Sequence, residues 1–216
     1  MQYKDILFDL DGTLTDPAEG ITGGFIYALD KYGIHVEKRS GLFKVIGPPL
    51  MYSFINFFGF DEKTAAEACV YYREYYSERG KYENRVYDGV EELLQKLADA
   101  GKRLIVATSK PEFFARDILD HFGIAKYFYY IAGSTTDGER TTKYDVVKYA
   151  LEVCGIDDKT AAVMVGDRKY DVEGARMAGL DTIGVLYGYG SREELEKAGA
   201  LKIAGTPENL AEILLM

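Results

Sequence analysis

The stretch YKDILFDLDGTLTD, residues 3–16, decides the fold of this chain. An apolar run at residues 6–8 is followed at once by two acids, Asp9 and Asp11, and then by Gly12 and Thr13. An apolar run without polar alternation is typical of a strand buried on both faces of a parallel sheet. We therefore predict a buried strand over residues 4–10 that delivers two carboxylates where it ends.

From residue 84 onward, short strand-like runs alternate with amphipathic helical patterns. Further strands are predicted at 103–109, 127–133, 161–167, 181–188 and, with the weakest pattern, 200–205. Helices are predicted at 89–100, 112–121, 143–154, 170–178, 191–198 and 207–215. Ser191 with Glu194 has the pattern of a capping box, and Thr206 precedes a proline at a first helical position. This alternation predicts an α/β fold with a Rossmann-like parallel sheet flanked by helices.

Residues 16–83 interrupt the alternation. They show helical periodicity at about 18–32, 40–58 and 62–80, with little convincing strand. We predict an all-helical cap domain inserted after the first strand. Residues 1–15 and 84–216 would then form the α/β catalytic core, and residues 16–83 the cap. Within the cap, the tyrosine-rich stretch 68–82 is interpreted as an aromatic helix, partly packed and partly exposed, rather than as a ligand cage.

Composition restricts the partners. The 216 residues carry a net charge of −9, which argues against nucleic acid and anionic membranes. An anionic substrate would need local positive charge from a metal or a lysine. No signal-peptide pattern follows Met1, and no apolar run approaches the roughly 20 residues that span a bilayer. We expect a cytoplasmic protein that is monomeric, with a dimer left open. Its two cysteines and two histidines fit structural or surface positions.

Polar side chains follow four of the predicted strands. In an open parallel sheet, ligands bind beyond the carboxyl ends of the strands, so these residues should share one edge. They are Asp9, Asp11, Gly12 and Thr13 after the first strand, Thr108, Ser109 and Lys110 after the second, Lys143 at a helix start, and Asp167 and Asp171 after the strand at 161–167.

The segments DLDGT, VATSKP, the lone Lys143 and VGDRKYD resemble the four ordered motifs of the haloacid dehalogenase-like (HAD) hydrolases. The resemblance covers essentially the whole chain. Within that superfamily, IGPPL (46–50), DGERTTKYDVVKYAL (137–151) and GYGSREEL (188–195) are similar to local patterns of the phosphoglycolate phosphatase-like group. The resemblance implies phosphate monoester hydrolysis with Mg²⁺ as cofactor and a small phosphorylated metabolite as partner.

The chemistry assigns a role to each acid of the opening pair. Asp9 can attack phosphorus as a nucleophile, and Asp11 can protonate the leaving group and later activate water. The resemblance implies that Mg²⁺ is held by Asp9, the backbone carbonyl of Asp11 and Asp167, with Asp171 acting more through a bound water. Lys143 would neutralise Asp9 and the transferring phosphoryl group together.

Four further residues are candidate substrate ligands, and Thr108 is a candidate catalytic donor. Thr108 and the amides after Asp9 can donate to phosphoryl oxygens, which brings in Gly12 and Thr13, with Ser109 beside them. In the cap, residues 43–54 are predicted to face the substrate, with a stiff break at Gly47-Pro48-Pro49. Lys44 in this segment can meet a second anionic group, although a surface lysine at a plain turn explains it nearly as well.

Two features depart from the family pattern. The third motif has Tyr144 after Lys143 in place of a proline, and Lys110 competes for the lysine role. We prefer Lys143, because Ser109 and Lys110 lie one step past the strand and are expected to cap the next helix. The fourth motif has Gly166 before Asp167 where some relatives have two acids, which leaves fewer metal ligands.

The leading hypothesis is thus a Mg²⁺-dependent phosphatase that resembles phosphoglycolate phosphatases or 5′-nucleotidases. A phosphomutase of the β-phosphoglucomutase type has the same core and cap, and a non-enzymatic phospholigand-binding module on this fold is a third reading. The substrate stays open among phosphoglycolate, nucleoside monophosphates, sugar phosphates and pyrophosphate.

Overall fold

The computed structural model describes residues 3–216, which divide into two compact units. One unit, here named the core unit, contains the residues up to Asp16 together with Val86–Met216. The other, named the cap unit, is Pro17–Arg85. Two short strands, β2 (Thr15–Asp16) and β3 (Arg85–Val86), pair with each other where the chain leaves and re-enters the core unit.

Six strands of the core unit, counted within residues 3–216, form one parallel sheet in the order β5-β4-β1-β6-β7-β8. They are β1 (Asp5–Phe8), β4 (Arg103–Pro111), β5 (Tyr130–Ser134), β6 (Ala162–Gly166), β7 (Asp181–Val185) and β8 (Lys202–Ala204). The opening stretch supplies a central strand, with Leu7 opposite Ile105 on one side and Met164 on the other. The predicted parallel sheet is confirmed.

Each predicted helix of the core unit is confirmed to within one residue at its ends. The helices are α4 (Val90–Asp99), α5 (Glu112–His121), α6 (Lys143–Val153), α7 (Lys169–Ala178), α8 (Arg192–Ala198) and α9 (Pro207–Leu215). Short 3₁₀ turns, η3 (Ala125–Tyr127) and η4 (Lys159–Ala161), lead into β5 and β6.

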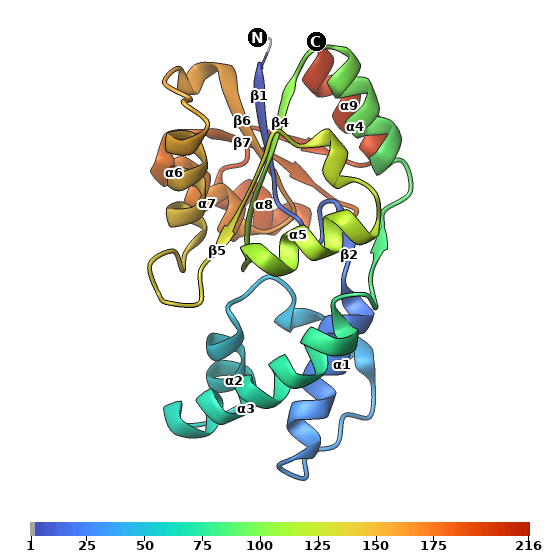
Figure 1. Cartoon of the computed structure of the whole chain (residues 1–216), viewed down its shortest axis with the longest axis vertical. Coiled ribbons are helices and arrows are strands. Elements are labelled where there is room, and N and C mark those ends of the chain that lie inside the picture. The colour runs from blue at the N-terminus through green and yellow to red at the C-terminus, as the bar shows by residue number, and fades with distance from the viewer. Residues whose placement is uncertain (1–2) are drawn as a thin grey trace. The chain divides into compact units, whose positions relative to one another are not determined.

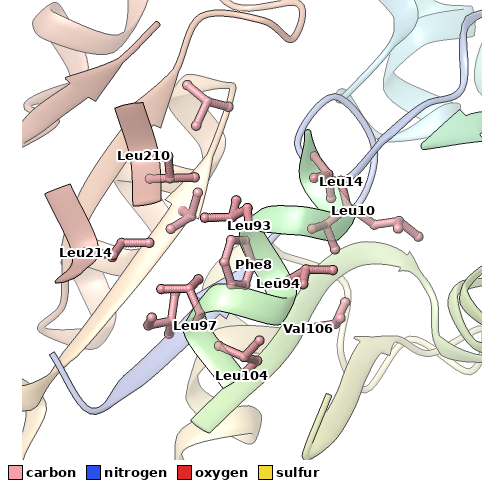
Figure 2. Packing of buried hydrophobic residues seen from close by; sticks show 14 of the residues in the cluster. Phe8, Leu10, Leu14, Leu93, Leu94, Leu97, Leu104, Val106, Leu210 and Leu214 are labelled. Atoms are coloured by element: carbon pink, nitrogen blue, oxygen red, sulfur yellow. The ribbon is translucent and has the colours of Figure 1, made fainter. Parts of the chain in front are cut away.

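Successive residues of β1 point to opposite faces of the sheet, and each face carries its own hydrophobic core. Phe8 belongs to a cluster with residues of α4, α5 and α9, where Leu93, Leu94, Leu97, Leu210 and Leu214 surround it (Figure 2). Leu7 belongs to the opposite cluster with residues of α6 and α7. In Figure 1, α6 and α7 accordingly lie on the other side of the sheet from α4 and α9. The sheet is therefore covered on both faces and is open to ligands only at its ends.

The two predicted capping signals have different outcomes. Thr206 caps α9 by accepting a hydrogen bond from the backbone N–H of Asn209, as predicted. Ser191 likewise caps α8 by accepting from the N–H of Glu194. The carboxylate of Glu194, however, does not complete a capping box. It accepts from the backbone N–H of Lys169 and from Nε of Arg168, so it braces the start of α7 instead.

The cap unit is helical. Its elements are α1 (Ala18–Asp30), η1 (Arg39–Val45, a 3₁₀ helix), α2 (Leu50–Phe58), α3 (Glu62–Tyr75) and η2 (Tyr76–Gly80, a π-helical turn). The periodic stretch 40–58 is therefore two helices, and the predicted break at Gly47-Pro48-Pro49 is confirmed. Gly47 adopts a φ of +103°, and each proline lacks the N–H that helix continuation needs.

Aromatic side chains form the interior of the cap unit. The ring of Phe25 on α1 lies 4.8 Å from that of Phe54 and 5.3 Å from that of Tyr72, measured between centroids. Gly24 makes room for this packing, because a Cβ there would lie 2.7 Å from the Tyr72 ring. Tyr72 also stacks on Tyr76. The interpretation of the tyrosine-rich stretch as a packed helix is confirmed.

Cys69 and Cys154 are free and buried, and His35 and His121 are exposed, as predicted. No helix within residues 3–216 combines the length and the apolar character that a bilayer crossing requires.

Candidate active site

The acids predicted from separate strand ends gather at the carboxyl edge of the sheet. Asp9 directly follows β1, Asp167 directly follows β6, and Asp171 lies in the first turn of α7. All three are buried, and each offers a carboxylate oxygen that lies within 4.8 Å of the other two. The parallel topology produces this cluster, because strands adjacent in the sheet end at one edge.

Lys143 neutralises two of these acids. Its Nζ donates to Oδ1 of Asp9 at 2.7 Å and to the carbonyl of Ala107 at 3.0 Å, and it lies 2.8 Å from Oδ1 of Asp171. Burial by itself disfavours the ammonium, but the charges of Asp171 and Asp9 outweigh it and raise the pKa of Lys143. Lys143 is therefore a fixed positive charge beside the candidate nucleophile.

A small residue on α7 makes room for this lysine. A Cβ at Gly174 would lie 2.7 Å from Cγ of Lys143, so any larger residue there would displace the side chain. The lysine stands at the first residue of α6, where Thr142 and Asp145 form a capping box that fixes the helix start. Helix capping thus sets the point from which Lys143 reaches into the site.

Asp167 is fully buried, and its two oxygens differ. Oδ2 accepts a hydrogen bond from the backbone N–H of Tyr189 at 2.7 Å, whereas Oδ1 has no hydrogen-bond partner among the described residues. Burial and then the charges of Asp171 and Asp9 raise the pKa of Asp167 well above its ordinary value. A buried carboxylate oxygen without a partner is costly, and a bound cation would satisfy it.

The donor set therefore fits a hard divalent cation. Mg²⁺ prefers oxygen ligands, and Asp9 and Asp167 supply carboxylate oxygens, one of them unpartnered. Both oxygens of Asp171 already have protein partners, since Oδ1 lies beside Lys143 and Oδ2 accepts from the N–H of Arg168 at 3.0 Å. Burial raises the pKa of Asp171 to about 6, against the opposing charge of Lys143.

Gly12 lies against Asp167 in the turn that follows β1. Its φ is +86°, and a Cβ there would lie 2.2 Å from Oδ2 of Asp167, so only glycine fits. The N–H of Gly12 donates to the carbonyl of Thr15, and that of Thr13 donates to the carbonyl of Leu10. These two amides therefore serve the turn, and the fully buried Thr13 hydroxyl has no hydrogen-bond partner within residues 3–216.

The hydroxyl of Thr108 lies at the end of the neighbouring strand. Thr108 is buried, and its Oγ1 accepts from the backbone N–H of Lys110 at 3.3 Å, so its own proton is available for another acceptor. Ser109 is half-buried beside it.

Asp11 pairs with Lys110. Oδ2 of Asp11 lies 2.5 Å from Nζ of Lys110, and Oδ1 is buried with no hydrogen-bond partner in the described part of the chain. Burial raises the pKa of Asp11, and the nearby charge of Lys110 opposes that rise. The prediction that Ser109 and Lys110 cap the next helix is wrong, because β4 continues to Pro111, and α5 begins without a side-chain cap.

The loop after β7, which was not predicted as part of the site, contacts Asp167. A Cβ at Gly188 would lie 2.5 Å from the Asp167 side chain, and one at Gly190 would lie 1.8 Å from the Asp167 carbonyl. Tyr189, between them, donates its N–H to Asp167 and its hydroxyl to Asp16. The sequence feature that could have predicted this contact is Gly188-Tyr189-Gly190 just past the end of a strand, because closely spaced glycines let the backbone approach a neighbouring residue.

Lys44 belongs to the cap unit. It is exposed on η1, and its Nζ lies 5.0 Å from the ring centroid of Phe57. Its role as a substrate ligand stays a prediction.

Comparisons with known proteins identify relatives of this chain. A family profile described as haloacid dehalogenase-like hydrolase matches residues 6–185. A 5′-nucleotidase from Pseudomonas aeruginosa is 47% identical over 195 residues, which cover 90% of this chain and 88% of the relative. Phosphoglycolate phosphatases also occur among the relatives, and the one from Colwellia psychrerythraea is 31% identical over 92% of both chains.

Two further matches extend over the whole chain. A solved structure described as a predicted phosphatase from Clostridium acetobutylicum has a TM-score of 0.95 and 51% identity, covering 100% of this chain and 99% of that one. The tyrosine-protein kinase PtkA of Mycobacterium tuberculosis is 44% identical over 212 residues, which cover 97% of this chain and 72% of the relative.

Proposed function

The chain belongs to the haloacid dehalogenase-like hydrolases and is a phosphatase of that family, and on this premise we propose that it hydrolyses small phosphate monoesters through an aspartyl-phosphate on Asp9. One observation carries the proposal. Asp9 forms a buried cluster with Asp167 and Asp171, and Lys143 holds Asp9 in place there by a hydrogen bond. A buried carboxylate that is hydrogen-bonded to an ammonium is suited to attack an electrophile.

In the first step, a carboxylate oxygen of Asp9 forms a bond to phosphorus while the ester P–O bond breaks. Asp11 begins this step as the carboxylic acid and gives its proton to the leaving alkoxide, becoming a carboxylate. In the second step, water attacks the phosphorus of the aspartyl-phosphate and gives its proton to Asp11. The bond to Asp9 then breaks, inorganic phosphate leaves, and both acids return to their starting states.

The remaining residues bind and orient the phosphoryl group. The hydroxyls of Thr108 and Thr13 are the candidate donors to its oxygens, with Gly12 and Ser109 beside them, and Lys143 offsets the charge that builds up on it. Mg²⁺, held by Asp9, the Asp11 carbonyl and Asp167, with Asp171 acting through water, would neutralise phosphoryl charge when bound. The cap residues 43–54, with Lys44, select the substrate in this proposal.

Nucleoside 5′-monophosphates rank first among the proposed substrates, because the 47% identical relative is named a 5′-nucleotidase. Phosphoglycolate ranks second, on the more distant relatives of that name. A cytoplasmic location and a monomeric state are part of the same proposal.

The test is phosphate release from a panel of nucleotides, phosphoglycolate, sugar phosphates and pyrophosphate, with Mg²⁺ and with chelator. Wild type should release phosphate from at least one monoester only when Mg²⁺ is present. Asp9→Asn should lose about a thousandfold or more of that activity while melting at a similar temperature. Absence of release from every substrate with Mg²⁺ present would refute the proposal.

The match to PtkA adds a second candidate, phosphoryl transfer to a protein tyrosine. An aspartyl-phosphate can pass its phosphoryl group to any hydroxyl that reaches it, so a hydrolase, a mutase and a kinase differ in the acceptor. Incubation with ATP and a tyrosine peptide, and product analysis of sugar phosphates for isomers, would identify each acceptor. Free phosphate as the main product supports the phosphatase.

A further inference from the structure

The two lysines of the site each hold one acid of the opening pair. Nζ of Lys143 lies 2.7 Å from Oδ1 of Asp9, and Nζ of Lys110 lies 2.5 Å from Oδ2 of Asp11. We propose that Lys110 is a positioning residue for Asp11: it fixes Oδ2 and thereby directs Oδ1 to the leaving-group oxygen of the substrate. This inference rests on the proposed phosphatase function, which assigns proton transfer to Asp11.

The pair is buried. The side chain of Lys110 is 6% exposed, and that of Asp11 is 15% exposed. A largely buried pair of an ammonium and a carboxyl group contributes little to folding stability, because taking the charge out of water offsets most of the attraction. A fold that needed only stability at this position could use apolar residues. The pair is therefore better explained by what it does to Asp11 than by what it adds to the fold.

The two oxygens of Asp11 have different surroundings. Oδ2 contacts the ammonium, whereas Oδ1 is buried and has no hydrogen-bond partner among the described residues. Rotation about the last side-chain bond would exchange the two oxygens, since that torsion is broad in aspartate. An ammonium on one oxygen prevents the exchange and leaves the other in a constant place, and constant placement of a reacting group lowers the barrier to reaction.

Lys110 is itself held rigidly by β4. The strand continues past Thr108, and its register against β5 shifts between Ala107 and Pro111. Gly133 on β5 packs against this end, because a Cβ there would lie 2.7 Å from the carbonyl of Lys110. A site residue on a packed strand is placed more accurately than one on a loop. The close packing of Gly133 thus fixes the backbone of Lys110, from which the side chain reaches Asp11.

The experiment compares two substrates whose leaving groups differ in their need for a proton. An alkyl phosphate releases a strongly basic alkoxide, whereas p-nitrophenyl phosphate releases a weakly basic phenolate. Lys110→Met should lower kcat/KM about 100-fold for the alkyl phosphate and about threefold or less for p-nitrophenyl phosphate. The quantity kcat/KM is used because it reports on substrate binding and formation of the aspartyl-phosphate, and not on the later hydrolysis of that intermediate.

Lys102→Met is the matched control. Lys102 is also buried, lies just before β4, and donates to the backbone carbonyl of Tyr3 at 2.6 Å, a partner outside the candidate active site. This variant loses a buried ammonium from the same region, and it should leave the ratio of the two kcat/KM values within about twofold of wild type.

A double-variant cycle shows whether Lys110 acts through Asp11. In an Asp11→Asn background, adding Lys110→Met should change kcat/KM for the alkyl phosphate by less than about twofold, because the group being positioned no longer transfers a proton. Equal losses for both substrates, or a full 100-fold loss in the Asp11→Asn background, would overturn the proposal, since Lys110 would then act on the substrate or on the fold.

Two provisions keep the test decisive. If Lys110→Met does not fold, Lys110→Ala takes its place, because alanine cannot donate to Asp11. A loss confined to the alkyl phosphate is again expected, and an even loss again overturns the proposal. Wild-type turnover of both substrates reports on the phosphatase function itself, so its failure is distinguishable from an unchanged substrate ratio in the Lys110 variant.

Discussion

Gly12→Ala should damage the proposed metal site through a single added methyl group. Gly12 has a φ of +86°, and its Cβ would lie 2.2 Å from Oδ2 of Asp167, the oxygen that accepts from Tyr189. The left-handed backbone costs an alanine about 1–2 kcal/mol. The overlap is closer than a nonbonded contact allows, so Asp167 must move, which breaks its hydrogen bond and adds about 1–3 kcal/mol.

Gly101→Ala separates the two effects. Gly101 has a φ of +73°, and a Cβ there would meet nothing within 4 Å. It therefore carries the backbone cost alone, and urea denaturation should show a loss of about 1–2 kcal/mol in its free energy of unfolding. Gly12→Ala should lose at least about 1 kcal/mol more than this control.

The Mg²⁺ response gives the second readout. Displacement of Asp167 should weaken Mg²⁺ binding about 10–100-fold in Gly12→Ala, measured as the Mg²⁺ concentration that raises the melting temperature halfway. Gly101→Ala should respond to Mg²⁺ as wild type does. If the two variants lose equal stability and respond equally to Mg²⁺, the placement of Gly12 against a metal ligand is refuted.

Two further predictions concern stability. Burial raises the pKa of Asp171 to about 6, so between about pH 4 and pH 6 the native state binds more protons than the unfolded state. In chelator, the free energy of unfolding should therefore fall by about 3 kcal/mol as the pH rises through this window, and Asp171→Asn should flatten that fall. Urea denaturation at several pH values measures this, and the same fall in the variant as in wild type would contradict the prediction. Thr206→Ala should lower the free energy of unfolding by about 1 kcal/mol through loss of the cap on α9, with phosphatase activity unchanged; a wild-type urea midpoint would show that the cap is not stabilising.

The alternation of apolar strands and amphipathic helices was enough to predict the core sheet. Parallel strands buried on both faces need continuous apolar runs, and β1, β4 and β6 each provide one. The ends of the strands were predicted less well. The strand predicted to begin at residue 127 begins at Tyr130, and the one predicted to end at residue 109 continues to Pro111. Apolar runs show where a strand is buried, whereas pairing with neighbours decides where it stops.

Contacts between distant segments could not be predicted from local patterns. Glu194 has the spacing of a capping-box residue, yet its carboxylate braces Lys169 and Arg168 on the preceding helix. Lys110 was weighed as a rival of Lys143, but in the structure Lys143 pairs with Asp9 and Asp171, whereas Lys110 pairs with Asp11. In both cases the residue type predicted a polar contact, but the partner in that contact depended on which helices and strands pack together.

The sequence by itself determined the class of fold and the chemical groups at the sheet's edge, because hydrophobic periodicity and the residues after each strand are local properties of the chain. Only the tertiary structure decided how those groups are paired. It decided which lysine contacts which acid, which oxygen of Asp167 has no hydrogen-bond partner among residues 3–216, and which glycines let the loop after β7 approach Asp167. The physical reason is that burial and charge act through distances of a few ångströms. Those distances are set by the packing of strands and helices far apart in the chain.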